Sequence, residues 1–280
     1  MNPASRISTL VSEMGGGPVL VHSDPFRAAR LVGALREKEA FLDAHVSMLR
    51  DAAADHVLWL PAFNYDFPKT QVFDVRSSES QLGPIPERFR LTKAEWRTPI
   101  PIFSIAGTGP APLPSWGPDT DPFGEDSIFA ALVKGDGVVL YYGYTFAYNT
   151  LVHYAERVSG GPVYRYDKLF SGRVVMANGA SIDGSLDYHV RPLGTGLDYD
   201  WERLMNEAID AGVCRKVEGF PEILAASARS LSDLWVEDIR RDPFALLDSR
   251  TRAWAEPAVE KLGRRFVVGD FEPQHAGTTA

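Results

Sequence analysis

Short apolar runs alternate with amphipathic stretches in the first part of the chain. Residues 18–23 and 57–61 are apolar runs bounded by polar or proline positions, which predicts two buried strands. Between them, a helix fits residues 26–36 after Pro25, and a second helix fits residues 41–54. This order of strand, two helices and strand predicts a layered α/β fold in which helices cover both faces of a sheet.

The rest of the chain carries similar patterns. Asp126 and Ser127 can cap a helix that ends at Gly135, and an apolar strand over residues 137–142 follows that helix. The last third of the chain is expected to be mostly helical. Further predicted strands cover residues 102–106, 163–166, 173–176 and a stretch around 188–190, the second and third flanking a turn, and further predicted helices cover residues 87–90, 150–158, 201–211, 221–240 and 250–262.

Length and composition allow a substantial core, because the chain has 280 residues and 45% of them are hydrophobic. Residues 62–125 are rich in Pro, Gly, Ser and aromatic residues, and long loops in compact enzymes are usually functional or mobile. We expect an α/β fold: a single domain over residues 1–270 with a layered central mixed β-sheet covered by helices and a helical C-terminal part. The polar tail over residues 271–280 is expected to be disordered.

Charge and cysteine content exclude several classes of function. The formal net charge is −8, which disfavours nucleic-acid binding because that binding depends on neutralising phosphates. The single cysteine, Cys214, cannot form an intrachain disulfide, and no histidine lies near it in the sequence, so a plain thiol is favoured over a catalytic one. No signal peptide and no membrane-spanning apolar run is evident, so we expect a cytoplasmic protein with no membrane partner.

The segment 149–156 offers the clearest candidate chemistry. Asn149 or Thr150 can cap the predicted helix, which places His153 in or just after its first turn. The helix dipole disfavours a protonated imidazole there, and a neutral imidazole can accept a proton. Glu156 lies three residues later on the same helix face. Spacing alone still favours the alternative, a histidine packed in the core beside a solvated Glu156.

Other segments give weaker signals. Ser23 and the backbone amides after the first strand could bind an anion with Arg27 and Arg30, although ordinary helix capping is favoured. Gly124 precedes a helix N-terminus that could approach a ligand, and capping is again the alternative. We expect no metal, because the spacing of the histidines matches no common ligand motif. Ser104 lacks the context of a serine hydrolase, and no phosphate-binding glycine loop is present.

In combination and order, these segments resemble the aminoglycoside 3-N-acetyltransferase-like family. The resemblance extends from the first strand to about Asp248. The segments that carry it are Val19–Ser23, Leu60–Phe63, Gly83–Arg90, Phe123–Phe129, Asn149–Glu156 and Val163–Tyr166.

This resemblance implies a single α/β domain unrelated to the GNAT fold, acetyl-CoA as acyl donor, and direct transfer to an amine. It implies that His153 is the general base and that a second carboxylate comes from the region 198–202, for which Asp200 is expected. Glu156, which shares a helix face with His153, is also expected to take part in catalysis. The expected coenzyme-binding residues are His22, Ser23, Asp24, Arg27, Gly124 and Ser127, and the expected substrate-binding residues are Asn64, Tyr65, Asp66 and Asn149.

Departures from the family pattern bear on the acceptor. Resistance enzymes of the family carry an aspartate where this chain has Ala147, and histidines where it has Ile100 and Phe103. The segments containing Asn64 and Phe73 are more similar to a branch found among surface-polysaccharide genes. We therefore expect a small amino-sugar acceptor, such as a nucleotide-linked one. An aminoglycoside acceptor, a non-catalytic member that binds coenzyme A or a sugar, and a different acyl donor stay open. A homo-oligomer is compatible with the sequence.

Overall fold

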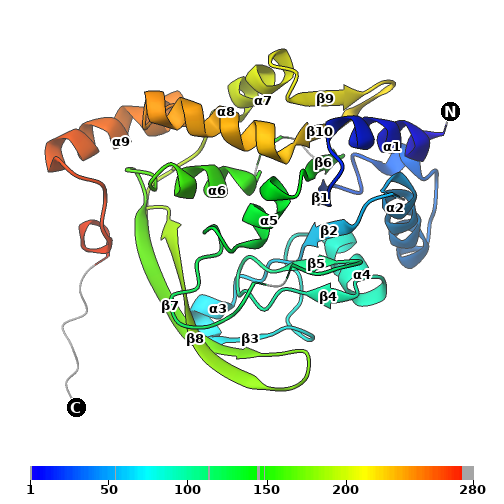
Figure 1. Ribbon diagram of the computed structural model, residues 1–280, viewed down its shortest axis with the longest axis horizontal. Coiled ribbons are helices and arrows are strands. Elements are labelled where there is room, and N and C mark those ends of the chain that lie inside the picture. The colour runs from blue at the N-terminus through cyan, green and yellow to red at the C-terminus, as the bar shows by residue number, and fades with distance from the viewer. Residues whose placement is uncertain (1, 54, 113, 144–145, 148, 273–280) are drawn as a thin grey trace.

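A seven-stranded mixed sheet forms the centre of the fold in the computed structural model, which describes residues 2–53, 55–112, 114–143, 146–147 and 149–272 (Figure 1). Its strand order is β4-β5-β2-β1-β6-β10-β9. The inner strands β2, β1 and β6 are parallel, and β4, β5, β10 and β9 pair antiparallel. The strands are β1 (Val19–Ser23), β2 (Leu58–Pro61), β4 (Trp96–Arg97), β5 (Ile105–Gly107), β6 (Val138–Tyr142), β9 (Cys214–Val217) and β10 (Phe220–Ser227).

Helices cover both faces of this sheet, which confirms the predicted α/β class. In β1, Val19 and Val21 face one core and Leu20 faces the other, so alternate residues bury opposite faces. Helices α1, α2 and α4 pack on the first core, and α5, α6 and α8 pack on the second. The bounds are α1 (Pro3–Met14), α2 (Lys38–Ala52), α4 (Pro84–Thr92), α5 (Ile128–Lys134), α6 (Leu151–Val158) and α8 (Ala228–Arg241).

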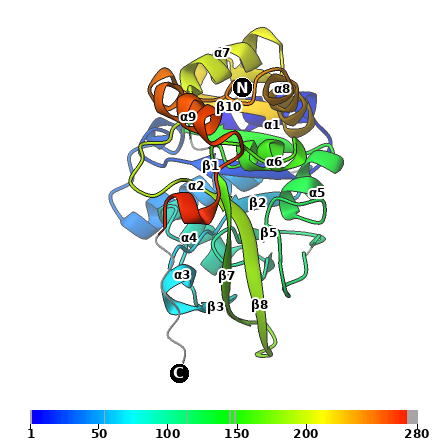
Figure 2. The same ribbon diagram turned by 90° about the vertical axis from the view of Figure 1, so that its left-hand side faces the viewer.

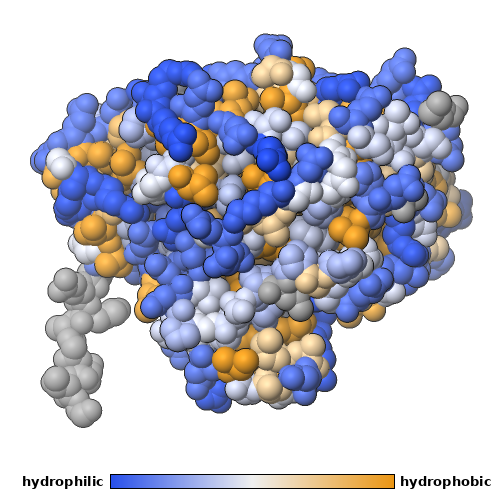
Figure 3. Space-filling model, in the orientation of Figure 1, coloured by the Kyte–Doolittle hydropathy of each residue, from blue (hydrophilic) through white to orange (hydrophobic). Residues whose placement is uncertain are grey.

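A long hairpin of β7 (Tyr166–Val175) and β8 (Ser181–Val190) extends away from the helical layer, and β3 (Val72–Asp74) pairs with β7 (Figures 1 and 2). Hydrophilic side chains cover most of the face seen in Figure 3.

The prediction of two short strands, 163–166 and 173–176, flanking a turn is wrong. Residues between them, including Gly172, belong to the continuous strand β7. A side chain at Gly172 would collide with the ring of Phe67 and the carbonyl of Gln71, so close approach requires glycine there.

Two other sequence predictions fail for identifiable reasons. Residues 26–36 form turns and a short 3₁₀ helix, η1 (Ala29–Leu31), because the Asp24 side chain binds the amides of Phe26 and Arg27 in a turn. Residues 221–227 belong to strand β10, not to a helix, since Ile223 to Ala226 pair with β6 and are buried. Helix α8 begins only after Ser227, whose hydroxyl accepts a bond from the Ser230 amide.

The C-terminal part is helical but ends in an ordered segment. Phe271 stacks on Tyr166, and the Glu272 carboxylate binds Lys168, so both residues, assigned to the polar tail, instead pack against β7. Residues 273–280 of the predicted tail lie outside the described residues. None of the described helices has the length and apolar character needed to cross a membrane. The remaining elements are α3 (Phe67–Thr70), α7 (Trp201–Asp210), α9 (Ser249–Leu262) and η2 (Val268–Asp270).

Candidate functional site

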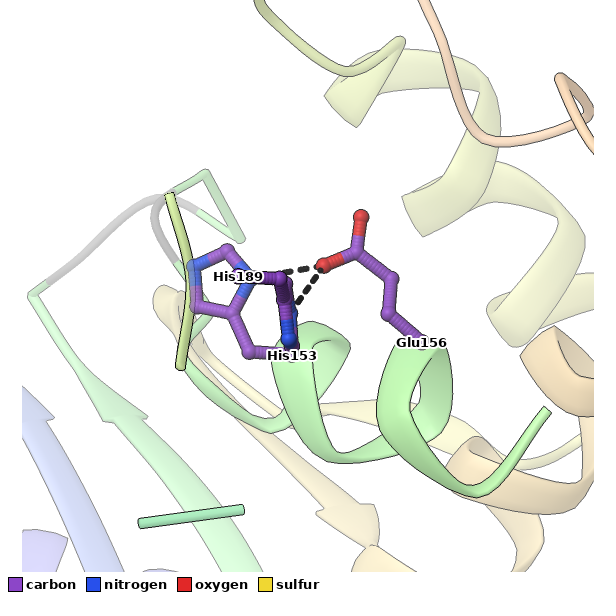
Figure 4. Close-up of side chains that lie close together, drawn as sticks. All are labelled: His153, Glu156 and His189. Atoms are coloured by element: carbon purple, nitrogen blue, oxygen red, sulfur yellow. Dashed lines mark hydrogen bonds and ion pairs between the residues drawn. The ribbon is translucent and has the colours of Figure 1, made fainter. Parts of the chain in front are cut away.

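A histidine and a carboxylate form the centre of the candidate site on helix α6. His153 and Glu156 lie three residues apart on one helix face, and the His153 Nδ1–H donates to Glu156 Oε2 at 2.8 Å (Figure 4). The Glu156 side chain is completely buried, whereas 22% of the His153 side chain is exposed. This bond fixes the tautomer in which Nε2 carries the lone pair. His153 therefore has its acceptor nitrogen at Nε2, where a proton could be taken up.

Glu156 is held by further donors from other parts of the chain. Its Oε2 also accepts a bond from His189 Nε2 at 3.0 Å, from strand β8. Its Oε1 accepts bonds from the hydroxyls of Tyr164 (2.8 Å) and Tyr199 (2.6 Å). The Arg165 guanidinium lies 3.5 Å from the same oxygen. Both carboxylate oxygens are therefore satisfied, as a buried charge requires.

This surrounding network sets the charge of the two central groups. Burial alone would raise the pKa of Glu156, but Arg165 and the two histidine bonds lower that pKa well below its ordinary value. Burial lowers the pKa of His153, and the cations of Arg165 and Arg191 lower it too, against the opposing effect of Glu156. Near neutral pH, the pair is thus an ionised carboxylate holding a neutral imidazole.

The same three side chains could in principle hold a metal, because ligand atoms of His153, Glu156 and His189 lie within 4.8 Å of one another. However, both histidine nitrogens face one carboxylate oxygen at hydrogen-bonding distance. The Arg165 cation also lies beside Glu156, where it would repel a metal ion. The arrangement favours a hydrogen-bonded network.

His153 lines a cavity of about 500 Å³, which is large enough for a small ligand. A smaller cavity of about 290 Å³ adjoins it beside Ser23 at the end of β1. Phe63, Tyr65 and Thr150 line both cavities, so the two spaces meet at these residues. Two ligands could therefore approach each other next to His153.

Several residues singled out from the sequence gather at these cavities. Tyr65 and Asn149 line the larger one with His153, and His22 and Ser23 line the smaller one. The Asn149 amide donates to the Tyr141 hydroxyl, and its carbonyl oxygen accepts a bond from the Leu151 amide at 3.2 Å. Asn149 therefore ties the start of α6 to strand β6.

Other predicted residues serve the local backbone instead. Asp24 accepts the turn bonds described above and lies 3.5 Å from Arg27. Asn64 donates to the Glu79 carbonyl at 3.0 Å and to Asp66 at 3.3 Å, which holds the loop that carries Tyr65.

Gly124 and Ser127 line a third cavity, of about 730 Å³, formed with the preceding loop. Ser127 also caps α5, because its hydroxyl accepts a bond from the Ala130 amide at 3.1 Å. These two positions, expected near the coenzyme, thus lie in a different cavity from His22 and Ser23.

Asp200, expected as the second carboxylate at His153, is not among the described residues that line the cavity. Its side chain caps α7 by accepting a bond from the Arg203 amide at 3.2 Å. Asp198, two residues earlier, lines the cavity instead. Ala147 leaves the position of the family aspartate without a carboxylate, and Glu156 orients His153 in this chain. Phe103, at a family histidine position, packs edge-on against Phe63 and Tyr188.

Four residues that complete the site are not predicted by any sequence pattern, namely Tyr164, Arg165, His189 and Tyr199. The stretches 163–166 and 188–190 are predicted as strands, and alternation along a strand allows His189 to face inward. No local pattern shows that these side chains meet at Glu156, because they come from separate segments.

Three buried histidines make the stability of the fold sensitive to acid. Burial lowers the pKa of His22, His45 and His189 to about 4 each. The unfolded chain takes up these protons near pH 6.5, so the free energy of unfolding should be fully retained above that pH and fall as the pH drops toward about 4. Urea denaturation from about pH 8 to about pH 4.5 measures this loss. His45→Gln should reduce the slope, and an unchanged slope would contradict the assignment.

Solved structures share this architecture. The structure described as AAC-IIIb binary with CoASH has a TM-score of 0.65 at 20% identity, covering 85% of this chain and 96% of that chain. The apoenzyme of aminoglycoside acetyltransferase AAC(3)-IVa has a TM-score of 0.63 at 21% identity, covering 93% and 97%. YokD protein from Bacillus subtilis has a TM-score of 0.61 at 16% identity, covering 86% and 94%. At these identities the likeness shows a common fold.

A search of curated proteins found no match. Residues 44–229, well over half of the chain, match the sequence family described as Aminoglycoside 3-N-acetyltransferase. The chain therefore belongs to the aminoglycoside 3-N-acetyltransferase family.

Proposed function

We propose that this enzyme transfers the acetyl group of acetyl-CoA directly to an amino group of an amino sugar, with His153 as general base. The enzyme is an N-acetyltransferase, and acetyl-CoA is its acyl donor. The observation that carries the proposal is the bond between buried, ionised Glu156 and His153 at the wall of a ligand-sized cavity. A base held in one tautomer beside a cavity is the arrangement that general-base catalysis requires.

His153 would remove a proton from the attacking ammonium group through Nε2. The freed amine then attacks the thioester carbonyl carbon, a C–N bond forms, and the C–S bond breaks. Glu156 stabilises the imidazolium that His153 becomes, because the Nδ1–H already donates to this carboxylate. As the C–S bond breaks, the nitrogen releases its second proton to solvent, and the proton held by His153 passes to the leaving thiolate. Glu156 stays ionised throughout, because Arg165 compensates its charge.

The two adjoining cavities suggest where the ligands bind. We assign the donor to the smaller cavity, which His22 and Ser23 line at the end of strand β1. The acceptor then occupies the larger cavity with His153. The related structure with CoASH supports a donor site in this fold. The shared wall at Tyr65 and Thr150 would bring the acetyl carbon and the amine together.

An aminoglycoside acceptor is the second candidate, favoured by the family description. AAC(3)-IVa structures contain apramycin and a gentamicin. Against it stand the positions Ala147, Ile100 and Phe103, which leave this chain without polar groups that the resistance enzymes carry. We therefore keep the amino-sugar acceptor, including a nucleotide-linked sugar of a surface polysaccharide, as the first candidate.

An acceptor panel tests the proposal. The protein is incubated with acetyl-CoA and either aminoglycosides or amino sugars in free and nucleotide-linked form, and thiol release is followed. We expect release above the hydrolytic background with amino sugars, and mass spectrometry should identify the N-acetylated product. Turnover confined to aminoglycosides would refute the amino-sugar assignment. If none of the amines in the panel were acetylated, the whole proposal would be refuted.

A further inference from the structure

The ionisable side chains around the cavity of His153, the larger of the two adjoining cavities, are unevenly paired. Of its cationic residues, Arg165 is compensated by Glu156 at 3.5 Å, and Lys168 binds Glu272 at 2.5 Å. Glu272 also accepts a bond from the Tyr166 hydroxyl at 2.6 Å, so its charge is used within the wall. The third cation, Arg191, has no carboxylate within 4.0 Å among the residues that the structure describes. One cation of the cavity is therefore uncompensated.

Arg191 is placed to meet a ligand. It follows strand β8 directly and lies two residues after His189, the residue that binds Glu156. It lines the cavity with His153 and Tyr188, is exposed to solvent, and is close enough to both side chains to influence their titration. A guanidinium presents two parallel N–H groups that suit a phosphate or a carboxylate.

The carboxylates available to a polycation are few. Asp198 is the one cavity-lining acid without a cationic partner within 4.0 Å among the described residues, and its Oδ1 already accepts bonds from the Tyr199 amide and the Trp201 indole. A ligand with several ammonium groups would face Arg165, Lys168 and Arg191 with this single acid. A ligand with one amine and one acidic group would match the two unpaired side chains, because the amine suits Asp198 and the acidic group suits Arg191.

We infer that the acceptor carries an anionic group, a phosphate or a carboxylate, in addition to its amine, and that Arg191 binds this group. The inference rests on the proposed function and narrows its substrate class. Arg191 is a specificity-determining residue: it selects the acceptor and takes no part in the proton transfer by His153. Phosphate could also come from the donor, and the experiment separates these two sources.

The test compares Arg191→Gln with wild type and with Arg241→Gln, a matched change on helix α8 whose arginine pairs with Glu237 and Asp238 on the surface. KM and kcat are measured for an amino sugar, its phosphate and its nucleoside-diphosphate form. We expect Arg191→Gln to raise KM for the phosphorylated acceptors by about 10- to 100-fold, with kcat and the neutral acceptor little changed. Arg241→Gln should behave as wild type.

Three results would overturn the inference. The first is that Arg191→Gln loses equal activity on neutral and phosphorylated acceptors, and the second is that wild type does not prefer the phosphorylated acceptors. The third is that Arg191→Gln raises KM for acetyl-CoA instead, which would assign Arg191 to the donor. If no acceptor reacts, the proposed function fails, but calorimetry still tests the anion site. Pyrophosphate, titrated with saturating coenzyme A present, should bind wild type and Arg241→Gln at least about 10-fold more tightly than Arg191→Gln. Equal binding would refute the inference.

Discussion

Replacing His153 with alanine is expected to lower kcat/KM for acetyl transfer by about 10²- to 10⁴-fold. The imidazole is the group at the cavity wall that can take the ammonium proton, and Glu156 holds it in the required tautomer. Its side chain is largely buried and packs on Phe123 and His189, so the truncation removes packing as well as the base, and the fold of the variant has to be checked. Thiol release gives kcat/KM, and circular dichroism checks that the variant is folded.

The comparison variant is His56→Ala, because His56 bonds to the Gly17 carbonyl at 2.9 Å on a different part of the fold. It should keep the wild-type rate. Added imidazole should restore part of the lost activity of His153→Ala, since a free base can enter the enlarged cavity. A rate unchanged by His153→Ala would refute the general-base role and favour a protein that binds its ligands without catalysis.

Local patterns predict the elements that are determined locally. Ser127 caps α5 and Gly135 follows its last residue, as the sequence indicates, because capping depends on the side chain and backbone of a few neighbouring residues. The stretch 221–227 could not be predicted in the same way. Its residues become a strand because β6 offers an unpaired edge, which only the assembled sheet provides.

In the candidate site too, residues that are close in the sequence could be predicted and residues from separate segments could not. His153 and Glu156 could be found together because three residues on one helix determine their proximity. His189 and Tyr199 reach Glu156 from separate segments, so their role follows from the tertiary fold. Asp200, expected as the second carboxylate, caps α7, whereas Asp198 lines the cavity, and the sequence does not distinguish these two positions. Spacing within one element is therefore informative, and the choice between neighbours in a loop is not.

Replacing Glu156 with glutamine should damage both activity and stability. The amide can accept through only one of its two terminal atoms, so either the two histidines or the two tyrosines lose an acceptor. Where the NH2 group faces the histidines, His153 Nδ1 must accept from it, and the ring takes the tautomer in which Nε2 is protonated and cannot act as a base. A comparable carboxylate-to-amide exchange in a serine-protease triad lowers kcat by about 10⁴-fold for this reason. We expect a loss of about 10²- to 10⁴-fold in kcat, measured where the variant is folded.

The stability change has a separate origin, the buried Arg165 that Glu156 compensates. Removing one partner of a buried ion pair costs about 3–5 kcal/mol, so Glu156→Gln should lower the free energy of unfolding by about that amount. The double variant Glu156→Gln/Arg165→Met removes both charges while the amide oxygen keeps one acceptor, so it should recover part of the stability, but none of the activity, because His153 still lacks its carboxylate. Urea denaturation and thiol release measure the two effects independently. If activity returned together with stability, Glu156 would act only as a structural counter-ion, and His153 would not need it to act as a base.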